Sequence, residues 1–340
     1  MLRSADFHLY GIKNICLKWI NKIQLSSLPI FQSMAILSIN NLTKNYGKIR
    51  ALNNVSFEVP PKTVFGILGP NGSGKTTLLG IVMDVIKSSG GSFTWAGEGL
   101  APNDLRKKIG TLLETPNFYH YLSAEKNLEI AAKIKGRGEG DIDKVLRIVN
   151  LYERKDSKFS TYSLGMKQRL AIAAALLGDP EILVFDEPTN GLDPAGIAEI
   201  RELIRELYRG GKTIIMASHI LDEVEKVCTH VAIIQKGVLK TVSSVADLMN
   251  ATGADVAATT FIELSAADNK ALKNVLEQMA GAQSVIEVEN DLQLICTEDI
   301  TGEAINRYCF EKGVVLNKLN VKRKSLETRF LEITGRQSDK

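Results

Sequence analysis

A run of eight residues in the first quarter of the chain has the spacing of a phosphate-binding loop. Residues 69–76 read Gly-Pro-Asn-Gly-Ser-Gly-Lys-Thr and match the pattern G-x-x-x-x-G-K-[ST] at every fixed position. Glycines let successive backbone N–H groups turn inward around a phosphate, where a Cβ would obstruct the approach. Lys75 is then expected to supply a cation to the outer phosphates, and Thr76 a hydroxyl to Mg²⁺.

The segments on either side of this loop predict the surroundings that it needs. Residues 64–68 form a short apolar run typical of a buried strand, and residues 77–82 open an amphipathic helix whose N-terminus would face the phosphates. This order of strand, loop and helix disfavours the alternative, a glycine-rich turn that contains lysine by chance. The residues expected to contact a nucleoside triphosphate are Gly69, Asn71, Gly72, Ser73, Gly74, Lys75, Thr76 and Thr77.

A second apolar segment ends in two carboxylates. Residues 182–186 read Ile-Leu-Val-Phe-Asp, and Glu187 and Pro188 follow directly. A carboxylate at such a strand end is placed to hold Mg²⁺, so Asp186 is the predicted metal ligand. Glu187 lies one residue further along and could polarise the attacking water as a general base. The pair favours hydrolysis, and the alternative interpretation is two solvated acids at a strand end.

A third run narrows the class of enzyme. Residues 162–169 read Tyr-Ser-Leu-Gly-Met-Lys-Gln-Arg. This run resembles the signature motif of ABC-type ATPases, usually L-S-G-G-Q-x-Q-R, and it keeps the serine, one glycine, the second glutamine and the arginine. The retained residues are Ser163, Gly165, Gln168 and Arg169.

Three further segments resemble motifs of the same family. Residues 190–193, which end in Asp193, look like the family's D-loop, and His219 follows an apolar strand where the family has its switch histidine. Tyr46 precedes the first loop, where the family stacks an aromatic ring on adenine. The resemblance covers about residues 36–249 with the motifs in the family's order. It implies that His219 contacts the γ-phosphate; taken alone, a satisfied polar residue at a strand end is the alternative.

The signature predicts a partner subunit. A helix that begins near Ser163 points its positive end and a serine hydroxyl at an anion, yet one domain offers no anion there. The resemblance implies a head-to-tail dimer, in which Ser163, Gly165, Gln168 and Asp193 of one ATPase subunit close over ATP held by the second. An ordinary N-cap is the structural alternative for Ser163, and the two roles are compatible.

The periodicity of the chain predicts an α/β fold with distinct parts. Residues 36–59 and 92–95 alternate as strands of an antiparallel subdomain, residues 120–160 are predicted to be a helical subdomain, and residues 181–238 predict a parallel sheet with crossover helices. After residue 260 the order βαββαβ predicts a ferredoxin-like accessory domain, either a packing or dimer-stabilising appendage or a ligand sensor. The expected divisions are a leader at 1–33, the P-loop ABC ATPase domain at 34–250 and the accessory domain at 251–340.

Two departures from the family pattern indicate a subgroup. The loop after the strand at 109–113 carries Glu114 where the family usually has a metal-contacting glutamine, so Glu114 is a third candidate metal ligand beside Thr76 and Asp186. The signature has leucine and methionine at positions 164 and 166. Both features resemble the ATPases of bacterial bacitracin-resistance and lantibiotic-immunity exporters.

Composition agrees with these expectations. The 340 residues are 44% hydrophobic and 24% charged, and no apolar run reaches the roughly 18 residues that span a bilayer, so a transporter would need a separate permease. Four cysteines without C-x-x-C spacing argue for reduced thiols. Residues 1–33 carry four basic side chains and one acidic one, while the remainder is neutral, so no nucleic-acid partner is expected. The leader precedes Met34, which we expect to be the biological start; a membrane-touching segment or a targeting peptide are alternatives.

These observations predict an ATPase that uses ATP and Mg²⁺, pairs with a second ATPase subunit and energises transport, with export favoured, through a transmembrane permease at the cytoplasmic face of the membrane. A peptide antibiotic or a lipid-like compound is the expected cargo. The alternative class is a soluble ABC ATPase acting on the ribosome or on nucleic acid. A purely nucleotide-sensing protein would be expected to lack Glu187 or His219, and both are present.

Overall fold

The structure is a computed structural model of the 340-residue chain. It describes residues 35–96, 108–113, 117–250, 260–288, 291–296, 300–322 and 326–334. The predicted leader, residues 1–33, and the candidate metal ligand Glu114 lie outside the described residues.

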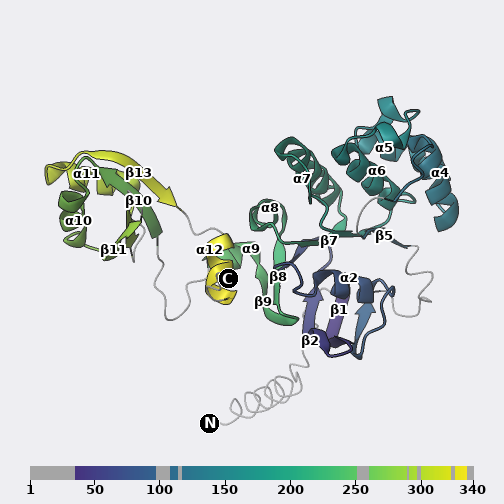
Figure 1. Ribbon diagram of the computed structural model, residues 1–340, viewed down its shortest axis with the longest axis horizontal. Coiled ribbons are helices and arrows are strands. Elements are labelled where there is room, and N and C mark those ends of the chain that lie inside the picture. Colours follow the sequence, from purple (N-terminus) through teal and green to yellow (C-terminus); the bar gives the residue numbers. More distant parts are fainter. Residues whose placement is uncertain are drawn as a thin grey trace, which may run out of the picture.

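A six-stranded sheet forms the centre of the ATPase part (Figure 1). In spatial order its strands are β5 (Ile109–Leu112), β6 (Ile182–Asp186), β7 (Thr213–Ser218), β3 (Val64–Leu68), β8 (His230–Gln235) and β9 (Val238–Ser244). The first five are parallel and β9 runs antiparallel at one edge. Every residue of β3, β6 and β7 is buried, as expected for parallel strands that are covered on both faces.

A three-stranded antiparallel sheet packs beside this centre. Its order is β2 (Ile49–Val59), β1 (Leu37–Tyr46) and β4 (Gly90–Trp95), which confirms the antiparallel subdomain expected from the alternating sequence. The rings of Phe57 in β2 and Phe65 in β3 stack with centroids 5.5 Å apart. Both sheets therefore contribute to one apolar core, which also includes helix α2 (Lys75–Val82).

The predicted helical subdomain is present between β5 and β6. It contains helices α4 (Ala124–Lys135), α5 (Ile142–Ile148) and α6 (Leu164–Leu176), joined by the short 3-10 turns η1 (Glu139–Asp141), η2 (Tyr152–Arg154) and η3 (Phe159–Thr161). After β6, helices α7 (Pro194–Arg209), α8 (Leu221–Val227) and α9 (Val245–Asn250) alternate with the remaining strands. None of the helices in the described part of the chain is long and apolar enough to cross a membrane.

The accessory part has the predicted order of elements. It contains β10 (Thr260–Ala266), α10 (Asn269–Glu277), β11 (Ala282–Val288), β12 (Asp291–Cys296), α11 (Gly302–Glu311) and β13 (Leu316–Lys322). The strands form one antiparallel sheet in the order β11-β12-β10-β13, the arrangement expected of a ferredoxin-like domain. Cys296 and Cys309 lie as free thiols in its separate core.

The last helix, α12 (Leu326–Thr334), returns to the ATPase part and packs against α8, α9 and β9. Leu326 is fully buried in the main core, and its backbone N–H donates to Glu225 Oε2 at 2.7 Å. At the other end, Gln235 Nε2 donates to the carbonyl of Thr334 at 3.2 Å. Packing therefore assigns α12 to the ATPase part, although the sequence grouped all of residues 251–340 in the accessory domain.

This arrangement predicts that a substitution in α12 destabilises the ATPase part. Leu326→Ala should lower the free energy of unfolding of that part by about 2–5 kcal/mol, because it leaves a cavity in the core. Urea unfolding followed by far-UV circular dichroism measures the change. Phe310→Ala is the control, since Phe310 is 71% exposed and its loss should change stability by less than about 0.5 kcal/mol. Equal midpoints for Leu326→Ala and the unmodified chain would contradict this packing.

Candidate functional site

The phosphate-binding loop lies between β3 and α2, as predicted. Gly74 has φ +107°, and a Cβ there would lie 2.6 Å from the carbonyl oxygen of Ala51, so only glycine fits. Gly74 is also the N-cap of α2 and provides no side-chain cap, which leaves the first N–H groups of the helix available to an anion. Ser73 is buried, and its hydroxyl has no hydrogen-bond partner among the described residues. This set of donors fits a phosphate group.

Strand order brings the two predicted catalytic residues to this loop. Glu187 follows β6 and His219 follows β7, which lies between β6 and β3 in the sheet. His219 Nδ1 and Glu187 Oε2 lie 2.8 Å apart, and Glu187 Oε1 lies 3.4 Å from Lys75 Nζ. The carboxylate of Glu187 therefore joins the loop lysine to the histidine, a connection that no single motif of the sequence indicates.

Two further features of this cluster bear on its chemistry. Lys75 is 5% exposed and its amine also donates to the carbonyl of Gly69 at 2.8 Å, so it turns back onto its own loop. Glu187 has φ +49°, a left-handed conformation that is uncommon for a residue with a side chain and that turns it away from the line of β6. Backbone conformations of this kind are concentrated at functional sites.

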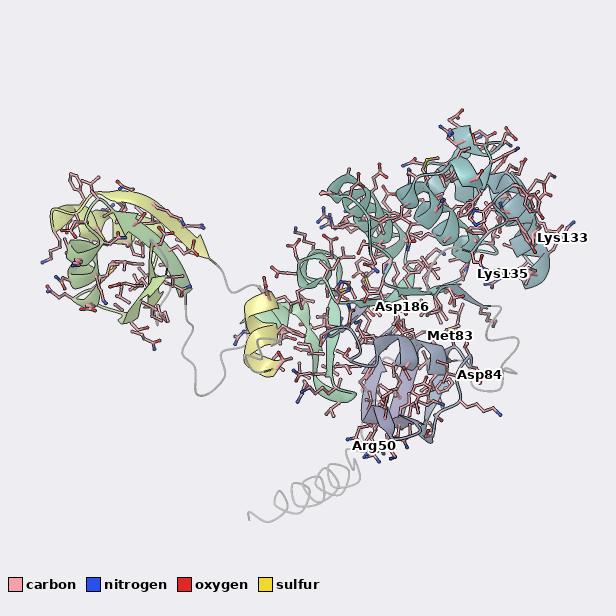
Figure 2. The ribbon with its side chains drawn as sticks, in the orientation of Figure 1. Arg50, Met83, Asp84, Lys133, Lys135 and Asp186 are labelled. Atoms are coloured by element: carbon pink, nitrogen blue, oxygen red, sulfur yellow. The ribbon has the colours of Figure 1, made fainter. Side chains whose placement is uncertain are left out.

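The metal candidates differ in their surroundings. Asp186 is buried at the end of β6 (Figure 2), whereas Thr76 is exposed on the first turn of α2. Among the described residues, no group of three or more His, Cys, Asp or Glu side chains could hold a metal by itself. The set fits Mg²⁺, which takes one or two protein ligands and completes its shell with phosphate and water. Thr189 is a buried neighbour that the sequence did not single out, and its hydroxyl has no partner within the described ranges.

The signature and the D-loop line a separate hollow of about 460 Å³. Ser163 is the N-cap of α6 and accepts from the N–H of Met166 at 3.2 Å, which leaves its hydroxyl proton to donate elsewhere. Asp193 caps α7 in the same manner, accepting from Gly196 at 3.0 Å. Gly165 also lines this hollow, whereas the phosphate-binding loop does not. The structure thus separates the signature from the loop within one chain.

The remaining nucleotide candidates are placed as follows. Tyr46 ends β1, is 45% exposed, and has Lys44 Nζ 4.9 Å from its ring centroid. Asn71 and Gly72 are exposed at the tip of the loop, and Thr77 is half-buried in α2. Gln168 is buried in α6 and does not line the hollow of the signature.

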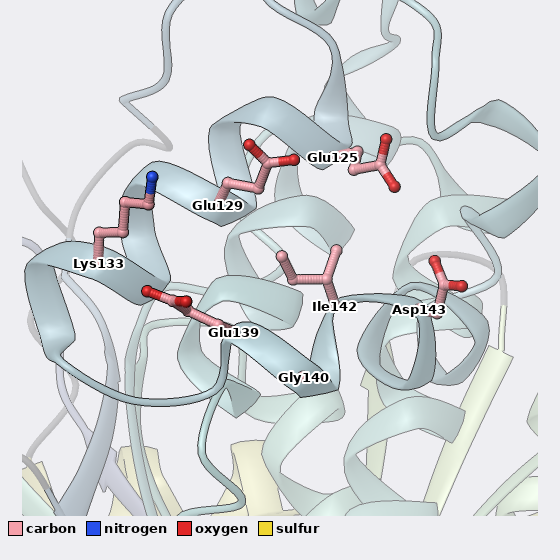
Figure 3. A pocket seen from close by; sticks show the side chains of 7 residues that line it. All are labelled: Glu125, Glu129, Lys133, Glu139, Gly140, Ile142 and Asp143. Atoms are coloured by element: carbon pink, nitrogen blue, oxygen red, sulfur yellow. The ribbon is translucent and has the colours of Figure 1, made fainter.

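A second hollow lies in the helical subdomain and does not suit a phosphate (Figure 3). It measures about 500 Å³ and is lined by Glu125, Glu129, Lys133, Glu139, Gly140, Ile142 and Asp143. Lys155 pairs with Glu125 and with Asp143, each at 3.2 Å. Because carboxylates dominate the lining, an anion would be repelled there, and the nucleotide site stays with the loop of Lys75.

Comparison with known proteins decides the family. A sequence model of the ABC transporter family matches residues 52–190. The bacitracin transport ATP-binding protein BcrA of Enterococcus faecalis is 33% identical over 304 residues, which is 88% of this chain and 96% of the relative. The chain belongs to the ABC transporter ATP-binding proteins. As a nucleotide-binding subunit of this family it hydrolyses ATP to energise transport.

Two other similarities bear on the site of this ABC ATPase. The lantibiotic transport ATP-binding protein SrtF of Streptococcus pyogenes is 42% identical over 202 residues, covering 59% of this chain and 88% of SrtF. A solved ATP-binding cassette, a dimer in a post-hydrolysis state with ADP and phosphate bound, has 27% identity and a TM-score of 0.55 over 62% of this chain and 98% of that one.

The position of Lys75 predicts how its loss affects binding. Lys75→Ala should weaken ATP binding by about 100-fold, because the outer phosphates lose a charge-assisted hydrogen bond. Titration with a fluorescent ATP analogue measures the dissociation constant. Lys126→Ala removes an exposed lysine from α4 and should leave the constant unchanged. A dissociation constant of Lys75→Ala equal to that of the unmodified chain would refute the assignment of this loop.

Proposed function

We propose that this ATPase works as a homodimer that drives export of a peptide antibiotic through a separate permease. The main support for a dimer is that the phosphate-binding loop and the signature lie apart in one chain. The hollow lined by Ser163 and Asp193 contains no residue of the loop. A second copy placed head to tail would bring its loop to that hollow. The dimeric cassette with bound ADP and phosphate supports this arrangement by analogy.

The proposed chemistry assigns one role to each side chain of the cluster. Lys75 leaves the carbonyl of Gly69 and binds the outer phosphates of ATP. Glu187 accepts the proton of the attacking water, and His219 holds the Glu187 carboxylate at 2.8 Å until the γ-phosphate draws the histidine away. Ser163 of the second copy donates its hydroxyl to the γ-phosphate from the positive end of α6.

The proposed metal ligands are Thr76, Asp186 and Glu114. The first two belong to the described site, at the start of α2 and the end of β6. Bound Mg²⁺ supplies neutralising charge to the phosphate oxygens during phosphoryl transfer. Thr76 and Asp186 would hold the ion, and Gly72 and Gly74 keep the loop backbone open to the phosphates.

The cargo and the permease are proposed from the relatives and from one exposed surface. The relatives are named for bacitracin and lantibiotic transport. Tyr119 and Tyr121 are 51% and 69% exposed in the segment before α4, and their rings meet at 6.0 Å between centroids. Phe118 and His120 of the same segment pack on the buried ring of Phe159 and anchor it. Such an anchored aromatic surface suits contact with a permease at the cytoplasmic face of the membrane.

The catalytic assignment predicts a split between binding and hydrolysis. Glu187→Gln should keep ATP affinity within about threefold and lower kcat at least about 100-fold, because an amide keeps the shape but cannot accept the proton. Steady-state phosphate release and nucleotide titration measure the two quantities. With ATP and Mg²⁺, the same variant should elute as a dimer on size exclusion. Wild-type turnover would show that Glu187 is not the general base, and elution as a monomer would contradict the head-to-tail dimer.

The permease contact predicts a second, independent result. Tyr121→Ser should lower bacitracin or lantibiotic resistance in cells that express the ATPase with its permease, while the basal ATPase rate of the purified subunit stays unchanged. The minimum inhibitory concentration measures resistance. Ile134→Ser is the matched control, because Ile134 is 81% exposed at the far end of α4. Full resistance with Tyr121→Ser would exclude this surface as the docking site.

A further inference from the structure

The C-terminal end of α6, opposite to the signature, is held by contacts that the catalytic cluster does not use. These contacts join the turn that ends α4, the last turn of α6 and strand β5, and we call them the α6 joint. The α6 joint consists of Lys135, Arg137, Gly138, Asp141, Ala174, Ala175, Gly178, Ile109 and Gly110.

The end of α4 turns two cations onto α6. Gly136 closes α4 in the left-handed conformation with φ +64°, and the N–H of Arg137 bonds back to Ala132 at 3.2 Å. Lys135 Nζ then donates to the carbonyl of Ala174 in the last turn of α6. This carbonyl is one of the four that an α-helix leaves without a partner of its own, so the lysine caps the negative end of the helix.

Close backbone contact reinforces this cap. Gly178 follows α6 with φ +78°, and a Cβ there would lie 2.5 Å from Arg137 Cδ. A Cβ on Gly138 would lie 2.5 Å from the nitrogen of Gly178. Asp141 Oδ2 accepts from that same nitrogen at 3.1 Å. The turn after α4 is therefore packed closely against the turn after α6, and the side chains of Arg137 and Asp141 contact Gly178 directly.

Strand β5 meets the same end of α6. Arg137 Nη2 donates to the carbonyl of Ile109 at 3.4 Å, and a Cβ on Gly110 would lie 2.3 Å from the carbonyl oxygen of Ala175. Strand β5 leads along the chain to Glu114, and α6 begins beside Ser163. The α6 joint thus connects the strand before one candidate site residue to the helix that carries another.

The two cations sit in the α6 joint at an energetic cost. Burial, together with the smaller effect of the neighbouring charge of Arg137, lowers the pKa of Lys135 to about 8. Burial also lowers the pKa of Arg137, whose Nε has no hydrogen-bond partner in the described part of the chain. Apolar groups of similar shape would fill such positions without a desolvation cost. Local conflicts of this kind are expected where a residue serves function rather than stability.

We propose that Lys135 and Arg137 are positioning residues that fix the angle of α6 against β5, and thereby aim Ser163 at the ATP of the second subunit. The helix has 13 residues and is about 20 Å long, so a small tilt at the α6 joint displaces Ser163 at the far end. The proposal rests on the head-to-tail dimer proposed above. It assigns no contact with nucleotide to either side chain.

The test compares Lys135→Met and Arg137→Met with Lys133→Met as a matched control. Methionine keeps an unbranched stem and removes the charge. Lys133 is exposed on the last turn of α4 (Figure 2), and among the described residues no hydrogen bond or ion pair joins its side chain to α6. Three quantities are measured for each variant: ATP affinity of the subunit, kcat and KM for hydrolysis, and the urea midpoint. ATP-driven dimerisation is measured with each substitution added to Glu187→Gln.

For Lys135→Met and for Arg137→Met, we expect kcat and the association constant of the dimer to fall about tenfold, a size typical of coupling between sites. ATP affinity and KM should change less than about twofold, because the loop of Lys75 is untouched. The urea midpoint should stay the same or rise, since a buried charge is removed. Lys133→Met should match the unmodified chain in every quantity.

Two other outcomes would contradict the positioning role, and a third would contradict the dimer. Unchanged kcat and unchanged dimerisation in both variants overturn the positioning role. Loss of activity in proportion to a lowered urea midpoint also overturns it, because that pattern marks a purely structural contact. If Glu187→Gln alone stays monomeric with ATP, the proposed dimer is wrong. In that case, kcat of Lys135→Met and Arg137→Met without the Glu187 substitution still shows whether the α6 joint affects catalysis.

Discussion

The whole site depends on the parallel register of three neighbouring strands. Leu68 of β3 pairs with Ser218 of β7, and Ala217 of β7 pairs with Asp186 of β6. Because parallel strands end at the same edge, the segments that follow them meet there: the phosphate-binding loop, the Asp186-Glu187 pair and His219. Backbone hydrogen bonds within the sheet thus bring together side chains that lie more than 100 residues apart in the chain.

Three titratable side chains at this edge contact one another in a chain: Lys75, Glu187 and His219. Glu187 neutralises Lys75 on one side and contacts His219 on the other. In the proposed site, bound phosphates would compete for the same lysine and the same histidine, so ATP binding would also release the Glu187 carboxylate. This competition gives a physical reason why hydrolysis would depend on full assembly of the site, and why a carboxylate is kept in a strained backbone conformation.

The two ends of α6 differ in their contacts. At its start, Ser163 caps the helix, and the positive helix end there is the one that we propose faces the γ-phosphate. At its finish, Lys135, Arg137 and three contacting glycines hold the helix against β5 and the turn after α4. At the other side of the ATPase part, α12 packs against α8, whose first residue follows His219 by two positions. The accessory sheet is therefore inserted between two helices, α9 and α12, that both pack on the ATPase part.

The sequence by itself determined the family, the motif residues and most elements, because glycine loops, caps and hydrophobic periods are local patterns. It predicted the βαββαβ order of the accessory part, and it gave a helix cap as one of two compatible roles for Ser163. The strand expected at 92–95 begins two residues earlier, at Gly90. Tertiary structure decided what depends on contacts distant in sequence: the bridge of Glu187 between Lys75 and His219, the return of α12 to the main core, and the cations at the end of α6. Such contacts follow from how strands pair and helices pack, and no spacing along the chain encodes them.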